Sequence, residues 1–292
     1  MIVTADPAAT DFEAHRPRLV RLAYRMLGSI AEAEDVAQDA WLRWQGADRR
    51  EIADPAAWLV RTATRLCLDR LRAAKTRREA YRGPWLPEPL IEDLAEDPLE
   101  RAEEVSVAFL LALERLSPLE RAVFLLHDVF DADFAAVAET LGRSEAAVRQ
   151  LAVRARDHVR DTRPRFSVGQ EEAARLAVAF MDAARNNDLE GLRNLLAEDA
   201  VLITDGGGKR HAALRPMVGR DDILALFKGL QWRTNWLATP KVRLVRVNGY
   251  LGAILDTDEG PITVAFQPGD SGRLAAIYMV VNPEKLGRVA PA

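Results

Sequence analysis

The sequence has few of the residues that build disulfides or metal centres, and it has no long apolar run. Of its 292 residues one is cysteine, Cys67, and four are histidine, so an internal disulfide and a zinc ribbon are excluded and a reducing compartment is favoured. No stretch approaches the roughly 18–20 apolar residues that a membrane span needs. The first residues carry acids where a signal peptide would be basic. These absences predict a cytoplasmic protein with no metal, no cofactor and no membrane partner.

Basic charge is not in excess either. The 40 Lys and Arg residues against 44 Asp and Glu give a net charge of −4, which by itself disfavours nucleic acid as a partner. The charges are unevenly placed, however: residues 83–105 hold one basic and eight acidic residues, whereas residues 1–82 hold 15 basic and 12 acidic. Because DNA contacts depend on local clusters of Lys and Arg, the total does not exclude DNA binding.

The period of the apolar residues changes along the chain. Up to about residue 165 they recur at helical spacing, and no strand is convincing. From residue 200 the period is two, and Asn248-Gly249 between two apolar runs predicts a tight hairpin. Helices are expected over about 171–187, over 189–197 and from Asp221. The sequence therefore predicts a multidomain fold, with all-α domains followed by an α+β part.

The segment 117–160 predicts a helix-turn-helix. Ser117 and Glu120 form a capping box around Pro118, which starts one helix. A short helix over 134–141 ends at Gly142, and a second helix over 145–160 follows. The first turn of such a helix faces the bases, and Arg and Gln suit base edges and phosphates. The expected DNA-reading residues are Ser144, Glu145, Ala146, Arg149, Gln150 and Arg154. The alternative is a solvated, arginine-rich face in a plain helical bundle.

Two earlier helices carry charge on one face. Asp35 and Asp39 are four residues apart, which on its own indicates only a solvated acidic stripe. Arg61, Arg65 and Arg72 share a face of the helix that begins at residues 54–55. A basic face of this kind can follow the phosphates of a single strand.

Together, residues 12–160 resemble a minimal sigma factor of the extracytoplasmic-function group of the sigma-70 family. The segment 29–41 resembles the family's helix that binds RNA polymerase core at the β′ coiled coil. That match implies contacts by Asp35, Gln38, Asp39 and Trp41. The segment 54–72 resembles the helix that melts promoter DNA at the −10 element, which implies contacts by Arg61, Arg65, Asp69 and Arg72. The helix-turn-helix then corresponds to the domain that reads the −35 element.

Residues 169–286 resemble the SnoaL-like branch of the nuclear-transport-factor-two-like fold, a cone of helices against a curved antiparallel sheet. A SigJ-like subgroup of these sigma factors carries such an extension. Short matches to that subgroup lie at 85–89, 205–209 and 282–286. They imply regulatory contacts by Trp85, Pro87, Asp205, Gly206, Gly207, Gly208, Lys209, Asn282, Pro283 and Lys285. The expected domains are 8–82 (region two), 83–105 (an acidic linker), 106–165 (region four) and 169–286 (regulatory).

Three other interpretations of the C-terminal part remain open. The glycine run before Lys209 suggests a phosphate-binding loop, but Arg210 follows where such a loop needs Ser or Thr. Asp205 or His211 could serve as an acid or base in a SnoaL-like enzyme, although neither has an evident partner and we expect no enzyme. A small-molecule ligand in the cone would instead make the chain a helix-turn-helix regulator with a sensor domain.

Overall fold

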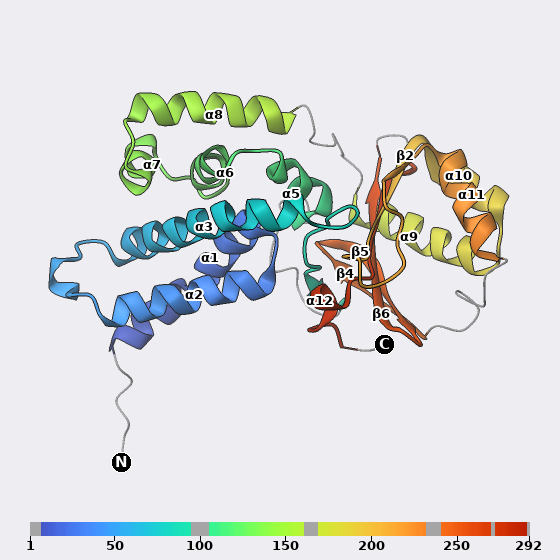
Figure 1. Ribbon diagram of the computed structural model, residues 1–292, viewed down its shortest axis with the longest axis horizontal. Coiled ribbons are helices and arrows are strands. Elements are labelled where there is room, and N and C mark those ends of the chain that lie inside the picture. Colours follow the sequence, from blue (N-terminus) through green and yellow to red (C-terminus); the bar gives the residue numbers. More distant parts are fainter. Residues whose placement is uncertain (1–6, 95–104, 161–168, 232–240, 270–271, 291–292) are drawn as a thin grey trace, which may run out of the picture. The chain divides into compact units, whose positions relative to one another are not determined.

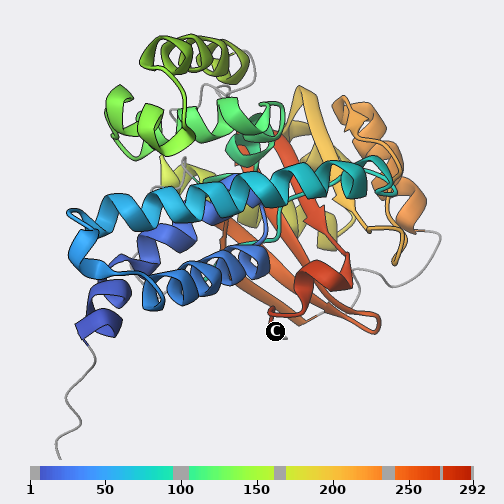
Figure 2. The same ribbon diagram turned by 60° about the vertical axis from the view of Figure 1, so that its left-hand side comes forward.

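The computed structural model describes residues 7–94, 105–160, 169–231, 241–269 and 272–290. The chain forms two compact units. The helical unit comprises Met1–Glu79 and Ala112–Arg163, and the sheet unit comprises Ala80–Leu111 and Pro164–Ala292 (Figures 1 and 2). Most of the predicted regions two and four thus falls in the helical unit, whereas residues 80–82, 106–111 and 164–165 and the whole predicted linker, 83–105, fall in the sheet unit.

Three long helices build the first part of the helical unit: α1 (Pro7–Leu27), α2 (Ile30–Gln45) and α3 (Pro55–Glu79), with the short η1 (Arg49–Glu51) between the last two. Ser29 caps α2 by accepting from Glu32 N. Large apolar side chains such as Leu19, Met26 and Trp44 are fully buried among these helices. Cys67 is also fully buried, and burial raises the pKa of its thiol, so it remains a neutral apolar side chain.

The second part of the helical unit confirms the predicted helix-turn-helix. It contains α6 (Pro118–Phe124), η2 (Leu125–Val129), α7 (Phe134–Leu141) and α8 (Glu145–Arg160), preceded by α5 (Val107–Glu114), whose first residues belong to the sheet unit. The capping box of Ser117 and Glu120 is present. Gly142 ends α7 in the left-handed conformation, with φ 61°. The apolar stripe of α8 is buried: Val148, Leu151, Ala152, Ala155 and Val159.

The sheet unit is α+β, as expected. Its seven strands have the order β1-β4-β5-β6-β7-β2-β3. The hairpin between β4 and β5 turns at Asn248 and Gly249, both with positive φ, as the Asn-Gly signal predicts. The sheet is not wholly antiparallel, because β2 and β7 pair in parallel. The strands are β1 (Ile91–Glu92), β2 (Leu196–Asp205), β3 (Met217–Val218), β4 (Lys241–Val247), β5 (Tyr250–Thr257), β6 (Gly260–Pro268) and β7 (Leu274–Val280).

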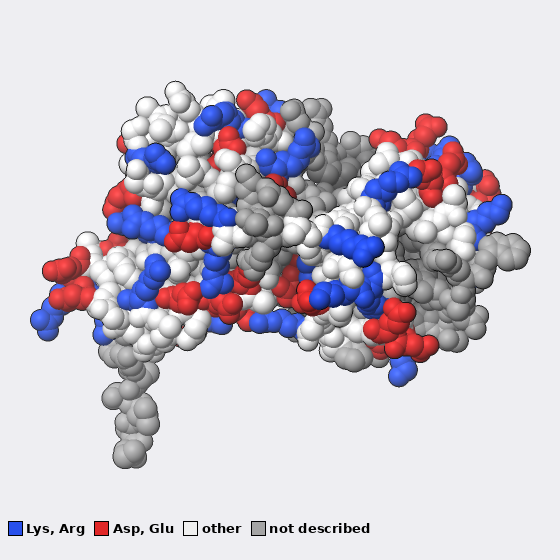
Figure 3. Space-filling model, in the orientation of Figure 1, with Lys and Arg blue, Asp and Glu red and all other residues white. Residues whose placement is uncertain are grey.

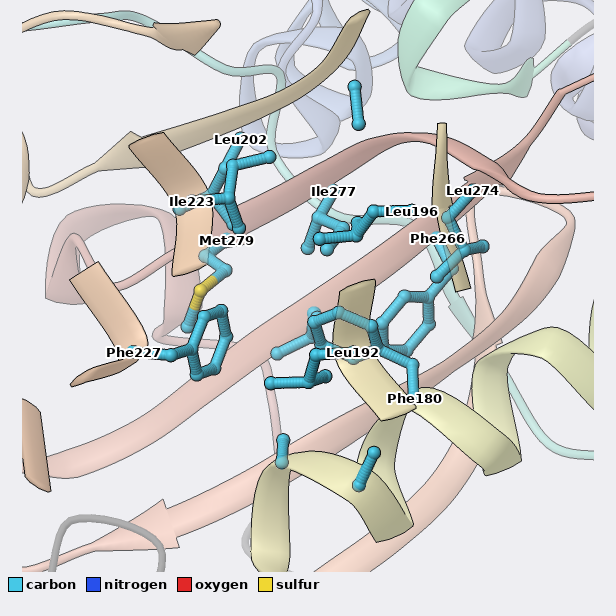
Figure 4. Packing of buried hydrophobic residues seen from close by; sticks show 14 of the residues in the cluster. Phe180, Leu192, Leu196, Leu202, Ile223, Phe227, Phe266, Leu274, Ile277 and Met279 are labelled. Carbon is cyan, nitrogen blue, oxygen red and sulfur yellow. The ribbon is translucent and has the colours of Figure 1, made fainter. Parts of the chain in front are cut away.

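Successive side chains of β6 and β7 enter two different apolar clusters, because neighbours along a strand point to opposite faces. One face packs against α9 (Gln170–Arg185), α10 (Leu189–Leu195) and α11 (Arg220–Gln231). In Figure 4 the rings of Phe180, Phe227 and Phe266 lie in this cluster; the Phe180 ring centroid is 5.7 Å from that of Phe227 and 5.4 Å from that of Phe266. The other face packs against Leu86, the start of α5 and the last helix, α12 (Pro283–Leu286).

Candidate DNA-binding and regulatory sites

The recognition helix α8 presents its predicted DNA-reading residues to solvent. Ala146, Arg149 and Gln150 are exposed. Arg149 is paired with Glu145 at 2.8 Å, and its guanidinium lies 4.9 Å from the ring centroid of Phe134. Ser144 caps the helix by accepting from Ala147 N at 3.3 Å, and the exposed Arg154 lies 3.5 Å from Glu120.

The predicted −10 residues on α3 are engaged by the helix-turn-helix. An Arg61 nitrogen lies 2.6 Å from a carboxylate oxygen of Glu139, and Arg65 Nε donates to Thr140 O at 3.3 Å. Both partners belong to α7. Arg72 instead pairs with Asp69 of its own helix at 2.8 Å. Two of the four predicted −10 residues therefore contact α7, and the other two contact each other.

A buried arginine joins α6 to α1 in the same unit. Arg121 donates to Met26 O at 2.7 Å and pairs with Glu114 at 2.7 Å. Burial lowers the pKa of Arg121 to about 10, so the side chain still carries its charge at neutral pH. The contact between the two groups of helices is thus partly polar. Because removing one partner of a buried pair leaves an uncompensated charge, this contact holds α6 firmly against α1.

The predicted polymerase-binding residues lie along α2. Gln38 is exposed, and Asp39 and Asp35 lie 2.7 Å and 3.6 Å from the guanidinium of Arg70 on α3. The Trp41 ring centroid lies 5.0 Å from that of Phe12. Figure 3 shows acidic and basic side chains interspersed on the face that it presents, so neither sign of charge dominates that face.

In the sheet unit, most of the predicted regulatory residues meet around one buried carboxylate. Asp205 ends β2 and is fully buried. Its Oδ1 accepts from Tyr81 Oη at 2.5 Å and Gly207 N at 3.0 Å, and its Oδ2 accepts from Leu86 N at 2.8 Å and Lys285 Nζ at 2.7 Å. A buried carboxylate is stable only when its charge and lone pairs are satisfied, as they are here. We call Tyr81, Trp85, Asp205, Asn282 and Lys285 the Asp205 cluster.

The other members of the cluster hold the segment before and within the linker. Lys285 Nζ also donates to Leu86 O and lies 4.3 Å from the ring centroid of Trp85 and 5.0 Å from that of Tyr81. Asn282 Nδ2 donates to Tyr81 Oη at 2.9 Å. Burial, followed by the hydrogen bond to Asp205, raises the pKa of Tyr81, so its hydroxyl remains a donor at neutral pH. Pro87 is buried next to Leu86, and Pro283 starts α12.

The glycine run is explained by close approach to this cluster. Gly207 and Gly208 have φ of 58° and 73°. A Cβ on Gly207 would lie 2.2 Å from Asn282 Nδ2, and a Cβ on Gly206 would lie 2.4 Å from Arg210 O. The loop therefore needs glycine at position 207 because it runs close to Asn282. This packing explains the glycine without a bound phosphate.

A cleft of about 430 Å³ lies beside this loop. Its lining includes Arg82, Lys209, Arg210 and His211. Lys209 pairs with Glu284 at 3.1 Å, and Arg210 pairs with Glu259 and donates to Pro261 O and Thr257 Oγ1. Lys209 and Arg210 are thus both paired with groups of the same chain. His211 is exposed, and Asp205 is held by the four donors described above.

Sequence reasoning missed three features that hold the linker. Tyr81 precedes the predicted contacts, and no signal marked it. Residues 91–92 form β1 and pair with β4, although a two-residue strand is too short for its period to be read. Asn248 was predicted only as a turn residue, yet its Oδ1 accepts from Leu90 N and its Nδ2 donates to Val105 O. The Asn-Gly signal predicts a turn and carries no information on the contacts of the Asn248 side chain.

Comparison with known proteins supports a single family. Residues 12–77 match the model for Sigma-70 region 2, and residues 106–159 match that for Sigma-70, region 4. The ECF RNA polymerase sigma factor SigJ of Mycobacterium tuberculosis is 41% identical over 290 residues, covering 94% of this chain and 92% of the relative. SigG of the same species is 33% identical over 234 residues, covering 68% of this chain and 62% of the relative.

The fold agrees with these sequence matches. The crystal structure of the M. tuberculosis extracytoplasmic function sigma factor SigJ aligns with a TM-score of 0.79 at 38% identity, covering 96% of this chain and 98% of that one. Within the described ranges, no helix is long and apolar enough to cross a membrane. The chain belongs to the extracytoplasmic-function sigma factors of the sigma-70 family, alternative sigma factors that bind RNA polymerase and direct it to specific promoters.

Proposed function

We propose that the sheet unit regulates this sigma factor by holding the linker through the Asp205 cluster, while α2, α3 and α8 provide the polymerase, −10 and −35 contacts. The observation that carries the proposal is the buried Asp205 carboxylate. Both of its oxygens accept from the segment that joins the two sigma regions, one from Tyr81 and the other from Leu86 N. A linker held in this way restricts the positions that regions two and four can adopt relative to each other.

The polymerase contact rests on α2. Asp35, Gln38 and Asp39 form a polar stripe along one side of the helix, with Trp41 at its end. Arg70 of α3 pairs with Asp39 and lies near Asp35. The proposed partner surface is the β′ coiled coil of the polymerase core, and the chain acts in the cytoplasm, where the polymerase is.

The −10 contact favours a second arrangement of the helical unit. Arg61 is paired with Glu139, which competes with DNA phosphates for its charge, whereas Arg65 is exposed and gives one N–H to Thr140 O. Separating α7 from α3 frees Arg61, and a partly exposed pair of this kind contributes only about 0–1 kcal/mol. A regulator needs two such arrangements with different affinities for the polymerase or the promoter.

No second function is favoured for the sheet unit. Apolar side chains, including Phe180, Phe227 and Phe266, pack between α9–α11 and the sheet (Figure 4). Asp205 is fully buried and fully hydrogen-bonded, which leaves no lone pair directed at a substrate.

The test is in vitro transcription with core polymerase and a promoter selected by the holoenzyme. We compare the full chain with Asp205→Asn, and use Asp199→Asn, an exposed carboxylate of the same strand, as the matched control. Asp205→Asn should change the transcript yield several-fold, whereas Asp199→Asn should not. Truncations at about residues 165 and 210 provide a second arm. Equal yields from all these chains would contradict regulation by the sheet unit.

A further inference from the structure

Two large apolar side chains are exposed among the described residues of the helical unit. Leu42 is 57% exposed and lies on α2, beside the residues assigned to the polymerase contact. Val153 is 56% exposed and lies in the middle of α8. The predicted DNA-reading residues do not include Val153, so its exposure needs a separate explanation.

Neither the fold nor the helix gains from a valine at position 153. The buried stripe of α8, from Val148 to Val159, is complete without it. Valine is β-branched and has a lower helix propensity than alanine. Its methyl groups also face water, which is unfavourable for an apolar side chain. An alanine would satisfy every structural requirement that we can identify at this position.

Val153 lies on the outermost face of the recognition helix. Ala146, Gln150 and Val153 are separated by four and three residues, so they share one face, and all three are exposed. The buried stripe lies on the opposite side of α8. The face extends about 10 Å from residue 146 to residue 153, the length of roughly three base-pair steps.

Three cations of α8 border the face between Ala146 and Val153, and beyond Val153 the same face carries the exposed Asp157 and Arg160. Arg149 is paired with Glu145, Arg154 lies near Glu120, and Arg156 is paired with Asp128 at 2.6 Å. The side chain of Gln150 has no hydrogen-bond partner within the described part of the chain. From Ala146 to Val153 the outward strip is therefore apolar, amide, apolar, with guanidinium groups beside it that suit phosphates.

This pattern matches the chemistry of an A·T pair in the major groove. Thymine presents a C5-methyl group there, which favours apolar contacts, and adenine pairs with the amide of Gln. We propose that Val153 contacts the C5-methyl group of a thymine in the −35 element, next to a base pair read by Gln150. The inference rests on the proposed role of α8 and adds a specificity-determining residue to it.

The experiment truncates each side of the contact: thymine loses its C5-methyl group, and Val153 loses its two γ-methyl groups. The holoenzyme first selects its −35 sequence from a randomised library. Each thymine of the selected site is then replaced by deoxyuridine, which lacks only the C5-methyl group. Binding is measured for the wild-type chain, for Val153→Ala and for the control Val178→Ala, an exposed valine of α9 at 40%.

One thymine-to-deoxyuridine replacement should weaken DNA binding by the wild-type holoenzyme about fourfold, which is the effect of one buried methyl group. The same replacement should leave the DNA affinity of the Val153→Ala holoenzyme unchanged, and Val178→Ala should respond to deoxyuridine as the wild type does. Equal deoxyuridine effects in wild type and Val153→Ala, no deoxyuridine effect, or a selected −35 site without thymine would overturn the inference alone. A holoenzyme that selects no −35 sequence would also overturn the proposed role of α8.

Discussion

The two faces of the sheet in the C-terminal unit are covered in different ways. On one face three helices bury a continuous apolar cluster that includes Phe180, Leu192 and Phe266. On the other, Leu86 and α12 complete a smaller cluster, and the Asp205 carboxylate lies beside it with its four donors. Apolar packing is not directional, whereas a buried ion pair depends on each partner. The first face therefore carries the larger apolar core, and we propose that the second face holds or releases the linker.

The largest loss of stability is expected from a substitution on the sheet face that α9, α10 and α11 cover. Phe266→Ala leaves a cavity between α9 and β6, and truncations of this type cost about 3–5 kcal/mol. The whole sheet unit should lose stability, with a lower melting temperature by calorimetry and loss of near-ultraviolet circular dichroism. A melting temperature within a degree of wild type would show that this face does not carry the fold.

The next largest loss of stability is expected on the opposite sheet face, where the linker contacts the Asp205 cluster. Lys285→Met leaves the Asp205 carboxylate buried without its cation, and breaking a buried pair in this way costs about 3 kcal/mol or more. Because the proposed contact holds only the linker, the loss should be local: limited proteolysis should cut within residues 83–94 before the rest of the unit unfolds. The double variant Asp205→Asn with Lys285→Met removes both charges and should be more resistant than Lys285→Met alone. Equal resistance would contradict the ion-pair account.

A smaller effect is expected in the glycine loop. Gly207→Ala adds a Cβ that meets Asn282 Nδ2 at 2.2 Å, in addition to the cost of positive φ. Gly142→Ala has a similar φ and nothing within 4 Å of the added Cβ, so it reports the conformational cost alone, about 1–2 kcal/mol. Denaturant unfolding should show Gly207→Ala to be the more harmful of the two. Equal losses would mean that the loop can move away from Asn282.

The smallest effect on stability is expected between α7 and α3. Glu139→Ala removes the partner of Arg61, and exposed pairs contribute about 0–1 kcal/mol. Melting should hardly change, while binding of the free chain to promoter DNA should rise by up to about fivefold. Glu13→Ala, an exposed carboxylate on α1, removes the same charge elsewhere and serves as the control. Identical gains from both variants would indicate a general charge effect.

The sequence allowed prediction of the elements whose signals are local. The capping box at Ser117, the Asn248-Gly249 hairpin and the buried stripe of α8 each follow from neighbouring residues, and the structure confirms them. The order of the motifs also indicated the family. The regulatory residues were proposed from a resemblance, and the structure brings most of them together around Asp205.

Contacts between distant segments could not be predicted in the same way. Tyr81 and Asp205 are 124 residues apart, and Arg65 and Thr140 are 75 residues apart. No periodicity marks such pairs, because each residue looks solvent-exposed in its own segment. The acidic, proline-containing linker reads as exposed for the same reason, although Leu86, Pro87 and Glu88 are buried.

The central claim is that the linker is held on the sheet by Asp205. Hydrogen exchange of the peptide covering residues 85–92 tests it directly, because Leu86 N donates to Asp205 Oδ2 and Leu90 N donates to Asn248 Oδ1. The full-length chain should protect these amides, and Asp205→Asn should lose much of that protection while β5 and β6 keep theirs. Exchange of the linker amides at the unprotected rate in the wild-type chain would contradict the account.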